Sequence, residues 1–219
     1  MLEHVIKDLK SIQDLVLVQI RSSSDSMDDD IRIIKDGRSA CALLLLLTAG
    51  LGSYDLDRIK PVGVALELLN LGIKKHFSKD SIENMGLIVS DHYFATALNI
   101  VVKLDDNWIV GRLSDALQEV ADGQVVKDYY SGLKSRCAFY QAACDIGARS
   151  SGLPRTLREA ALEFSLRLGM AMEARNEMYV PQLELADLVK KAYNALTELP
   201  APAVSDRIKE VTDAVVFSQ

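Results

Sequence analysis

The sequence predicts an all-α protein, and three observations support the prediction. Prolines occur only at positions 61, 154, 181, 200 and 202, which leaves long windows rich in Leu, Ala, Glu and Lys. Strand-like alternation bounded by Asn-Gly or Asp-Gly turns is absent. The 219 residues are 49% hydrophobic, which is enough to build one sizeable core. We therefore expect a single all-helical domain over residues 1–219, without internal repeats or a long linker.

The first helix is expected over the opening stretch, MLEHVIKDLKSIQDLVLVQI. Its apolar residues recur at the spacing of one helix face, namely at Val5, Leu9, Ile12, Leu15, Val16 and Ile20. The next stretch, SSSDSMDDD, predicts a polar loop that offers N-cap residues to the following helix. Its Asp28, Asp29 and Asp30 could bind a cation, although adjacent carboxylates on a solvated loop more often only add solubility.

Further helices are expected at about 39–50, 58–76, 80–103, 107–122, 125–150, 155–178, 183–198 and 203–217. The most apolar run, ACALLLLLTAGLG (40–52), is shorter than the roughly 20 residues that a membrane-spanning helix needs. Because Arg38 and Asp55 also flank it closely, we expect a buried core helix there. The N-terminal residues mix charge with apolar side chains from the start, which is unlike a signal peptide.

Charge and cysteine content exclude some classes of function. Lys and Arg total 25 against 31 Asp and Glu, so the net charge of -6 argues against a nucleic-acid binder, which needs a basic face. Cys41, Cys137 and Cys144 lack CxxC spacing, and the histidines are too scattered to complete a zinc site with them. We expect buried thiols in a reducing compartment, and hence a cytoplasmic protein.

Several stretches in a fixed order carry a family resemblance that covers most of the chain: ELLNLGIKKHF (67–77), NMGLIVSDHYFATAL (84–98), LSDALQEVADGQ (113–124), YYSGLKSRCAFYQAACDIGA (129–148) and LGMAMEARNEM (168–178). Together they resemble successive helices of the trans-isoprenyl diphosphate synthases, the polyprenyl synthetase family. The resemblance implies an isoprenoid-synthase-type helical bundle, shortened relative to the full family fold. Members of the family elongate allylic diphosphates with isopentenyl diphosphate, and Mg²⁺ on two facing aspartate-rich helix ends helps the diphosphate to leave.

The first aspartate-rich motif of the family is not preserved here. It should begin just after His76, where the chain reads FSKDS, with Phe77 and Ser78 in place of two aspartates and Ser81 at the third position. A phenylalanine and two serines cannot form a magnesium cluster. The segment between His76 and NMGLIVSDHY is much shorter than in the family, so the basic loop expected there is missing.

The second aspartate-rich motif is also eroded. Asn176, Glu177 and Val180 stand where the family has aspartates, and Glu173 replaces the usual glutamine. Glu173 and Glu177 share a helix face, so they could hold one divalent ion, or they could be ordinary polar residues beside a relic cavity. We accordingly expect no catalytic residue, cofactor or metal in this chain, with Glu173 and Glu177 as the weak metal candidates.

Few residues remain that could bind a diphosphate. The basic GGKRxRP segment of the family corresponds to DGRSACA, which keeps only Arg38 as a cation. Lys134 matches a family lysine, and without metals it could equally be a partner for nearby carboxylates. His76 completes the set of diphosphate candidates. The residues that would floor a prenyl tunnel include Lys74 and Lys75, which we expect to point to solvent or to meet an acidic partner surface.

The helix over 82–102 is apolar on more than one stripe, which suggests burial on two sides. The candidates for a subunit interface are Met85, Ile88, Phe94 and Leu98, although a central core helix would have the same pattern. Members of the family dimerise through helices, and in some of them a subunit without the aspartate motifs supports a catalytic partner.

The resemblance therefore implies a non-catalytic subunit of a heteromeric trans-polyprenyl diphosphate synthase, which influences product chain length. Its partner would be a catalytic synthase subunit that has intact DDxxD motifs and binds the Mg²⁺. Two alternatives stay open at this point. One is a weakly active Mg²⁺-dependent prenyltransferase that uses Glu173 and Glu177, with Asp80 and Glu83. The other is a homodimeric scaffold or binding protein of the same fold. Nucleic acid and a membrane span are not expected.

Overall fold

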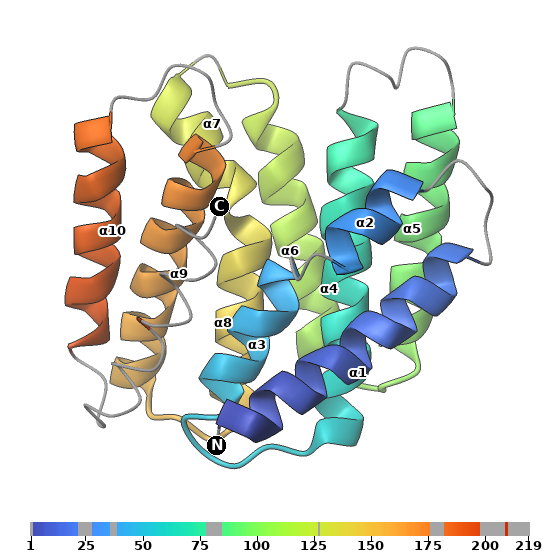
Figure 1. Cartoon of the computed structure of the whole chain (residues 1–219), viewed down its shortest axis with the longest axis horizontal. Coiled ribbons are helices and arrows are strands. Elements are labelled where there is room, and N and C mark those ends of the chain that lie inside the picture. The colour runs from blue at the N-terminus through green and yellow to red at the C-terminus, as the bar shows by residue number, and fades with distance from the viewer. Residues whose placement is uncertain are drawn as a thin grey trace.

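The computed structural model describes residues 2–21, 28–35, 39–77, 85–126, 128–175, 182–197 and 209 (Figure 1). The described residues form helices and connecting turns and contain no strand. The helices are α1 (Leu2–Arg21), α2 (Asp28–Lys35), α3 (Ala40–Ala49), α4 (Leu56–His76), α5 (Met85–Val102), α6 (Asn107–Gly123), α7 (Tyr129–Arg136), α8 (Ala138–Ser150), α9 (Arg155–Arg175) and α10 (Gln182–Leu196). The predicted all-α class is confirmed, while the helix expected over 203–217 lies outside the described residues except for Lys209.

Most helices run side by side and alternate in direction, and α1 crosses them obliquely (Figure 1). Aspartates fix where several of them begin, because a carboxylate just before a helix accepts hydrogen bonds from its first free N–H groups. Asp55 caps α4, Asp106 caps α6 and Asp128 caps α7 in this way. The helix termini define two ends of the bundle. At one end α4 and α6 start and α8 stops, and at the other end α4 and α9 stop (Figure 1).

The apolar run over 40–52 supplies α3, and nearly every side chain of that helix is buried. The predicted core helix is therefore confirmed. Helix α8 packs closely against it at Gly147, where an added Cβ would lie 2.2 Å from the Oγ1 of Thr48. Cys41, Cys137 and Cys144 are free and buried, as the sequence predicts. Among the described residues, no helix is long and apolar enough to span a bilayer.

Two predictions about the elements are wrong. The polar stretch before residue 31 ends in a helix, α2, and its Asp30 is only 2% exposed rather than part of a solvated loop. The helix expected over 125–150 is two helices, because the backbone N–H of Cys137 bonds back to the carbonyl of Lys134 and ends α7. The Sγ of Cys137 also donates to the carbonyl of Leu133. Both features depend on contacts that a helical periodicity does not encode.

Candidate functional site

Glu173, the weak metal candidate on α9, is bonded to residues of its own chain. Its Oε1 accepts a hydrogen bond of 2.8 Å from the hydroxyl of Tyr140 on α8. Its Oε2 lies 3.8 Å from the Nε of Arg136 on α7. One turn before it, Gly169 leaves room for the tyrosine ring, since an added Cβ would lie 2.6 Å from the Tyr140 Cδ2. Both carboxylate oxygens thus have protein partners.

The groups around Glu173 are held in their neutral forms. Burial, reinforced by the negative charge of Glu173, raises the pKa of the Tyr140 hydroxyl well above its usual value. The same two causes raise the pKa of the Cys137 thiol, and burial raises that of Cys41. A thiol must ionise to become a nucleophile, and burial opposes that ionisation in both cysteines.

The C-terminal end of α4, where the first metal motif would stand, is aromatic. Phe77 is 45% exposed, and its ring meets the His76 ring edge to face at 4.9 Å between centroids. His76 Nδ1 lies 3.2 Å from the Oγ of Ser90 on α5. The centroids of the His76 and Phe94 rings are 6.1 Å apart. Ser78, Asp80, Ser81 and Glu83 lie outside the described residues.

Lys75 forms an internal ion pair instead of pointing to solvent or to a partner. Its Nζ lies 3.4 Å from the Oδ1 of the buried Asp30 on α2, and the hydroxyl of Tyr93 on α5 donates to the Oδ2 at 2.9 Å. Burial raises the pKa of Asp30, while the charge of Lys75 opposes the shift. The expectation for Lys75 is thus wrong, and so is the prediction that Asp30 is a solvated loop residue. Lys74, in contrast, is exposed.

Glu67 on α4 is a buried carboxylate whose role sequence analysis missed. It is 1% exposed, and its Oε1 accepts a 2.7 Å hydrogen bond from the backbone N–H of Ala42. Because the side chain of Ser39 makes no capping bond, Glu67 caps α3 from the neighbouring helix. Burial raises its pKa to about 7, against the opposing effects of the Ala42 and Cys41 N–H groups and of Lys74. The sequence does carry one sign of such a role, because Glu67 is an acidic residue within the otherwise mostly apolar stretch VALELLNL.

The diphosphate candidates do not assemble into one described site. Lys134 is exposed on α7 and makes no ion pair with any residue whose placement the structure gives. The imidazole of His76 lies within hydrogen-bond distance of Ser90 on the neighbouring helix. Arg38 and Glu177 lie outside the described residues. Across the described part of the chain, no three His, Cys, Asp or Glu side chains gather closely enough to hold a metal ion.

Helix α5 buries one face and exposes an apolar one. Val89, Tyr93, Ala97 and Val101 are buried against the core, whereas the exposed side chains include Ile88 (61%), Leu98 (44%) and Val102. Phe94 is half-buried against Gly72 of α4, so it packs within the chain. The side chain of Met85 lies outside the described residues. Of the four interface candidates, Ile88 and Leu98 are free to meet a partner.

Comparison with known proteins gives the fold. No protein-family model matches the chain. The polyprenyl synthase from Caulobacter crescentus CB15, solved with calcium and isoprenyl diphosphate, superposes with a TM-score of 0.77 over 99% of both chains at 17% identity. The geranylgeranyl pyrophosphate synthase from Lactobacillus brevis ATCC 367, solved with citrate, gives 0.81 over 100% of this chain and 97% of that one at 12% identity.

Two curated proteins are similar in sequence. Heptaprenyl diphosphate synthase component 2 of Geobacillus stearothermophilus is 25% identical over an alignment of 172 residues, and the match covers 65% of this chain and 53% of that protein. The protein of the same name from Bacillus subtilis strain 168 is 23% identical over an alignment of 165 residues, with 63% of this chain and 47% of that one covered. The chain thus spans about half the length of these relatives. It has the helical fold of the trans-prenyl diphosphate synthases and resembles, in part of its sequence, component 2 of a heptaprenyl diphosphate synthase.

Proposed function

We propose that this chain is a non-catalytic subunit of a heteromeric trans-polyprenyl diphosphate synthase. It supports a catalytic partner and influences the length of the product in isoprenoid biosynthesis. The observation that carries the proposal is the chemistry of the two helix ends that would hold magnesium. At the first, Phe77 follows α4. At the second, the carboxylate of Glu173 on α9 accepts a hydrogen bond from Tyr140 and pairs with Arg136.

The residues at the C-terminal ends of α4 and α9 disfavour catalysis by this chain alone. Magnesium needs oxygen ligands with free lone pairs, and the phenyl ring of Phe77 offers none. Glu173 already accepts a hydrogen bond from Tyr140 and faces the cation of Arg136, and both compete with a metal ion for the same carboxylate. If a metal displaced the hydrogen bond, leaving the buried Tyr140 hydroxyl without a partner would cost about 1–3 kcal/mol. We assign the magnesium and the intact DDxxD motifs to the partner subunit.

The similarity in sequence supports a multi-subunit enzyme. The curated relatives carry the name component 2, and a protein so named is one of at least two components. The partner of this chain is accordingly proposed to be the other component of such a synthase. Three buried, unpaired cysteines fit the reducing cytoplasm, where we place the complex.

The exposed apolar face of α5 is the proposed contact with the partner. Ile88 and Leu98 are spaced by about three helical turns, and Val102 continues the same face one turn later. Burying a large aliphatic side chain contributes roughly 1.5–3 kcal/mol, so two or three such residues suffice to anchor a helix-to-helix interface.

Prenyl chain elongation tests the proposal with three preparations: this chain, the intact synthase of the same host, and the two co-expressed. Each receives Mg²⁺, an allylic diphosphate and isopentenyl diphosphate, and product length is measured by chromatography. We expect the two chains to co-purify and the product length or the rate to change in the mixture. Products that are identical with and without this chain, from chains that do not associate, would refute the proposal.

A matched pair of variants tests the interface. Ile88→Lys combined with Leu98→Lys should weaken association about 100-fold or more and restore the products of the synthase alone. The control is Val18→Lys, which changes an equally exposed apolar residue on α1. If the control disrupts the complex as strongly as the α5 variant, the contact is not on α5. A stable homodimer that does not bind the synthase would instead favour the alternative in which the chain is a scaffold protein.

A further inference from the structure

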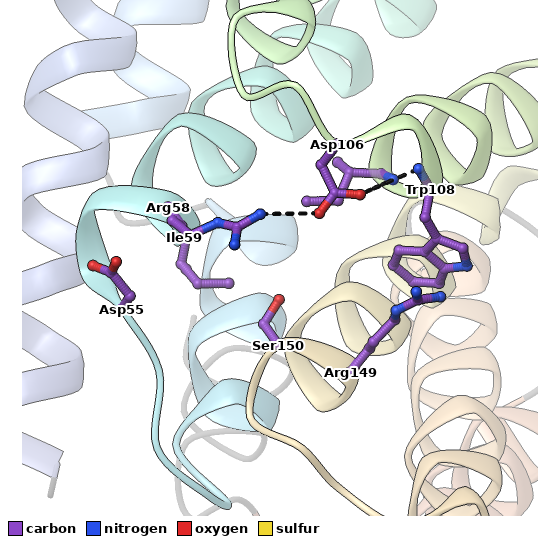
Figure 2. Close-up of a pocket in the computed structure, with 8 residues that line it drawn as sticks. Asp55, Arg58, Ile59, Asp106, Trp108, Arg149 and Ser150 are labelled. Carbon is purple, nitrogen blue, oxygen red and sulfur yellow. Dashed lines mark hydrogen bonds and ion pairs between the residues drawn. The ribbon is translucent and has the colours of Figure 1, made fainter.

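A pocket of about 270 Å³ lies at the end of the bundle opposite Glu173. Its walls come from the start of α4, the start of α6 and the end of α8 (Figure 2). The lining residues are Asp55, Arg58, Ile59, Asp106, Trp108, Ile109, Arg149 and Ser150. None of them belongs to the motifs that resemble the metal or diphosphate sites, so the pocket is separate from the proposed function.

The acidic side chains of the pocket already have partners. One oxygen of Asp106 accepts from the backbone N–H groups of Trp108 and Ile109 at 3.2 and 3.3 Å, and the other lies 3.1 Å from Arg58. Asp55 accepts from the N–H of Asp57 at 3.0 Å, and its carboxylate points away from the ion pair (Figure 2). The negative charge of the walls is therefore largely compensated by helix N-termini and by Arg58.

Arg149 is in the opposite situation. Its guanidinium carbon lies 4.0 Å from the centroid of the Trp108 ring, so the indole face holds the cation in place (Figure 2). Among the residues that the structure describes, Arg149 has neither an ion pair nor a side-chain hydrogen bond. A guanidinium stacked on a ring keeps its N–H donors at its rim, where they can bind an anion in two-point fashion.

The neighbours of Arg149 extend this donor set. Ser150, next along the chain, turns its side chain toward the space between Arg58 and Arg149 (Figure 2), and its hydroxyl makes no hydrogen bond to the part of the chain that the structure describes. Arg58 adds a second guanidinium, of which only one nitrogen is committed to Asp106. Ile59 supplies an apolar wall. Two cations and a hydroxyl thus converge on a cavity that has no uncompensated carboxylate aimed into it.

We propose that this pocket binds a small molecule that carries an oxyanion, either a carboxylate or a phosphate group. Arg149 is the primary ligand, Arg58 and Ser150 assist, and Trp108 orients Arg149. A volume of 270 Å³ is ample for phosphate, diphosphate or a short dicarboxylate, and the charged walls suit such an anion better than a chain of isoprene units.

The experiment uses intrinsic fluorescence, because Trp108 is the single tryptophan of the chain and lines the pocket. The full chain is titrated at constant ionic strength with inorganic phosphate, inorganic diphosphate and succinate, so that the phosphate and carboxylate sources are separated. Calorimetry repeats each titration without relying on the indole signal. We expect a saturable response to at least one of the three anions.

The variant Arg149→Gln should weaken that binding at least about tenfold, since it removes the charge-assisted hydrogen bonds. Its matched control is Arg167→Gln, an arginine on α9 whose ion pair within the described residues is to Glu163 of its own helix. Circular dichroism confirms that both variants fold. The absence of saturable binding for all three anions, or equal affinity in Arg149→Gln and the wild type, would overturn the proposal.

Discussion

The two ends of α4 and α8 use their charged and polar side chains in opposite ways. At the end near residue 76, which we call the filled end, Lys75 of α4 and Tyr140 of α8 bind Asp30 and Glu173 of the same chain. At the other end, the pocket end, Arg58 and Arg149 of the same two helices border a cavity. The filled end is where the resemblance places the two aspartate-rich motifs. Its charged and polar groups bind one another.

This difference separates structural from functional residues by their partners rather than by their type. A buried carboxylate with a cation and a hydroxyl beside it is satisfied, and removing one partner leaves an uncompensated charge. An exposed guanidinium stacked on an indole costs the fold little and retains its donors for a ligand. Substitutions at the filled end should therefore lower stability more than those at the pocket end.

The largest effect is expected for Lys75→Met, which leaves the Asp30 carboxylate buried, with Tyr93 as its remaining partner among the described residues. Breaking a buried ion pair costs about 3–5 kcal/mol, and since Lys75 is partly exposed we expect about 3 kcal/mol of lost unfolding free energy. Urea denaturation measures it. The control, Arg32→Met, breaks the exposed pair with Asp29 and should cost less than about 1 kcal/mol. Equal losses in the two variants would contradict the buried role of Asp30.

The second effect is a pH dependence that Glu67 sets. Burial raises its pKa from 4.5 to about 7 in the folded chain, so between these values the folded state binds more protons than the unfolded state. Its contribution to stability is therefore full below pH 4.5 and falls as the pH rises to 7, by on the order of 3 kcal/mol.

Unfolding free energies measured from pH 4.5 to 8 test this sign. Glu67→Gln keeps a carbonyl oxygen for the N–H of Ala42 and should flatten the curve. Glu119→Gln, at an exposed position on α6, should leave it unchanged. A curve for Glu67→Gln that is as steep as that of the wild type would assign the titration to another group.

A smaller loss is expected for Tyr140→Phe, which removes the hydrogen bond to Glu173. Hydrogen bonds to charged groups contribute about 1.5–3 kcal/mol, and because Arg136 remains we expect the lower value. Tyr54→Phe is the matched control near the pocket end, where the less buried hydroxyl of Tyr54 donates to Asp8. Thermal unfolding of both variants measures which one loses more stability. A greater loss of stability for Tyr54→Phe would contradict the comparison between the two ends.

The smallest effect on stability is expected for Arg149→Gln at the pocket end. It removes an exposed cation–π contact worth about 0.5–1 kcal/mol and no ion pair within the described residues. Urea denaturation should place it within about 1 kcal/mol of the wild type. A loss as large as that of Lys75→Met would mean that Arg149 is structural.

Much of the fold could be predicted from the sequence, because helix formation follows local periodicity. The core position of α3, the free buried cysteines and the order of the family-like helices all depend on residues close together in the chain. The burial of Asp30 could not be predicted, since its partners Lys75 and Tyr93 come much later in the chain. An aspartate triplet looks solvated until a distant lysine and tyrosine are brought to it.

The candidate sites divide in the same way. The phenylalanine at the place where the resemblance puts the first aspartate-rich motif, Phe77, can be read from the sequence, whereas the bonding of Glu173 depends on α7 and α8 and appears only in the structure. The pocket was missed entirely. Arg58, Trp108 and Arg149 belong to three separate helices, and none of them lies in a recognisable motif. Tertiary structure alone brings them together.

The most direct test of the central proposal, that this chain is not catalytic on its own, is diphosphate release by the isolated chain. The purified chain is incubated with Mg²⁺, an allylic diphosphate and isopentenyl diphosphate, and the inorganic diphosphate that forms is measured. We predict no release above the background without protein, in the wild type and in Glu173→Gln alike. Turnover by the wild type that Glu173→Gln abolishes would contradict the account, because it would show that this carboxylate still acts on a substrate.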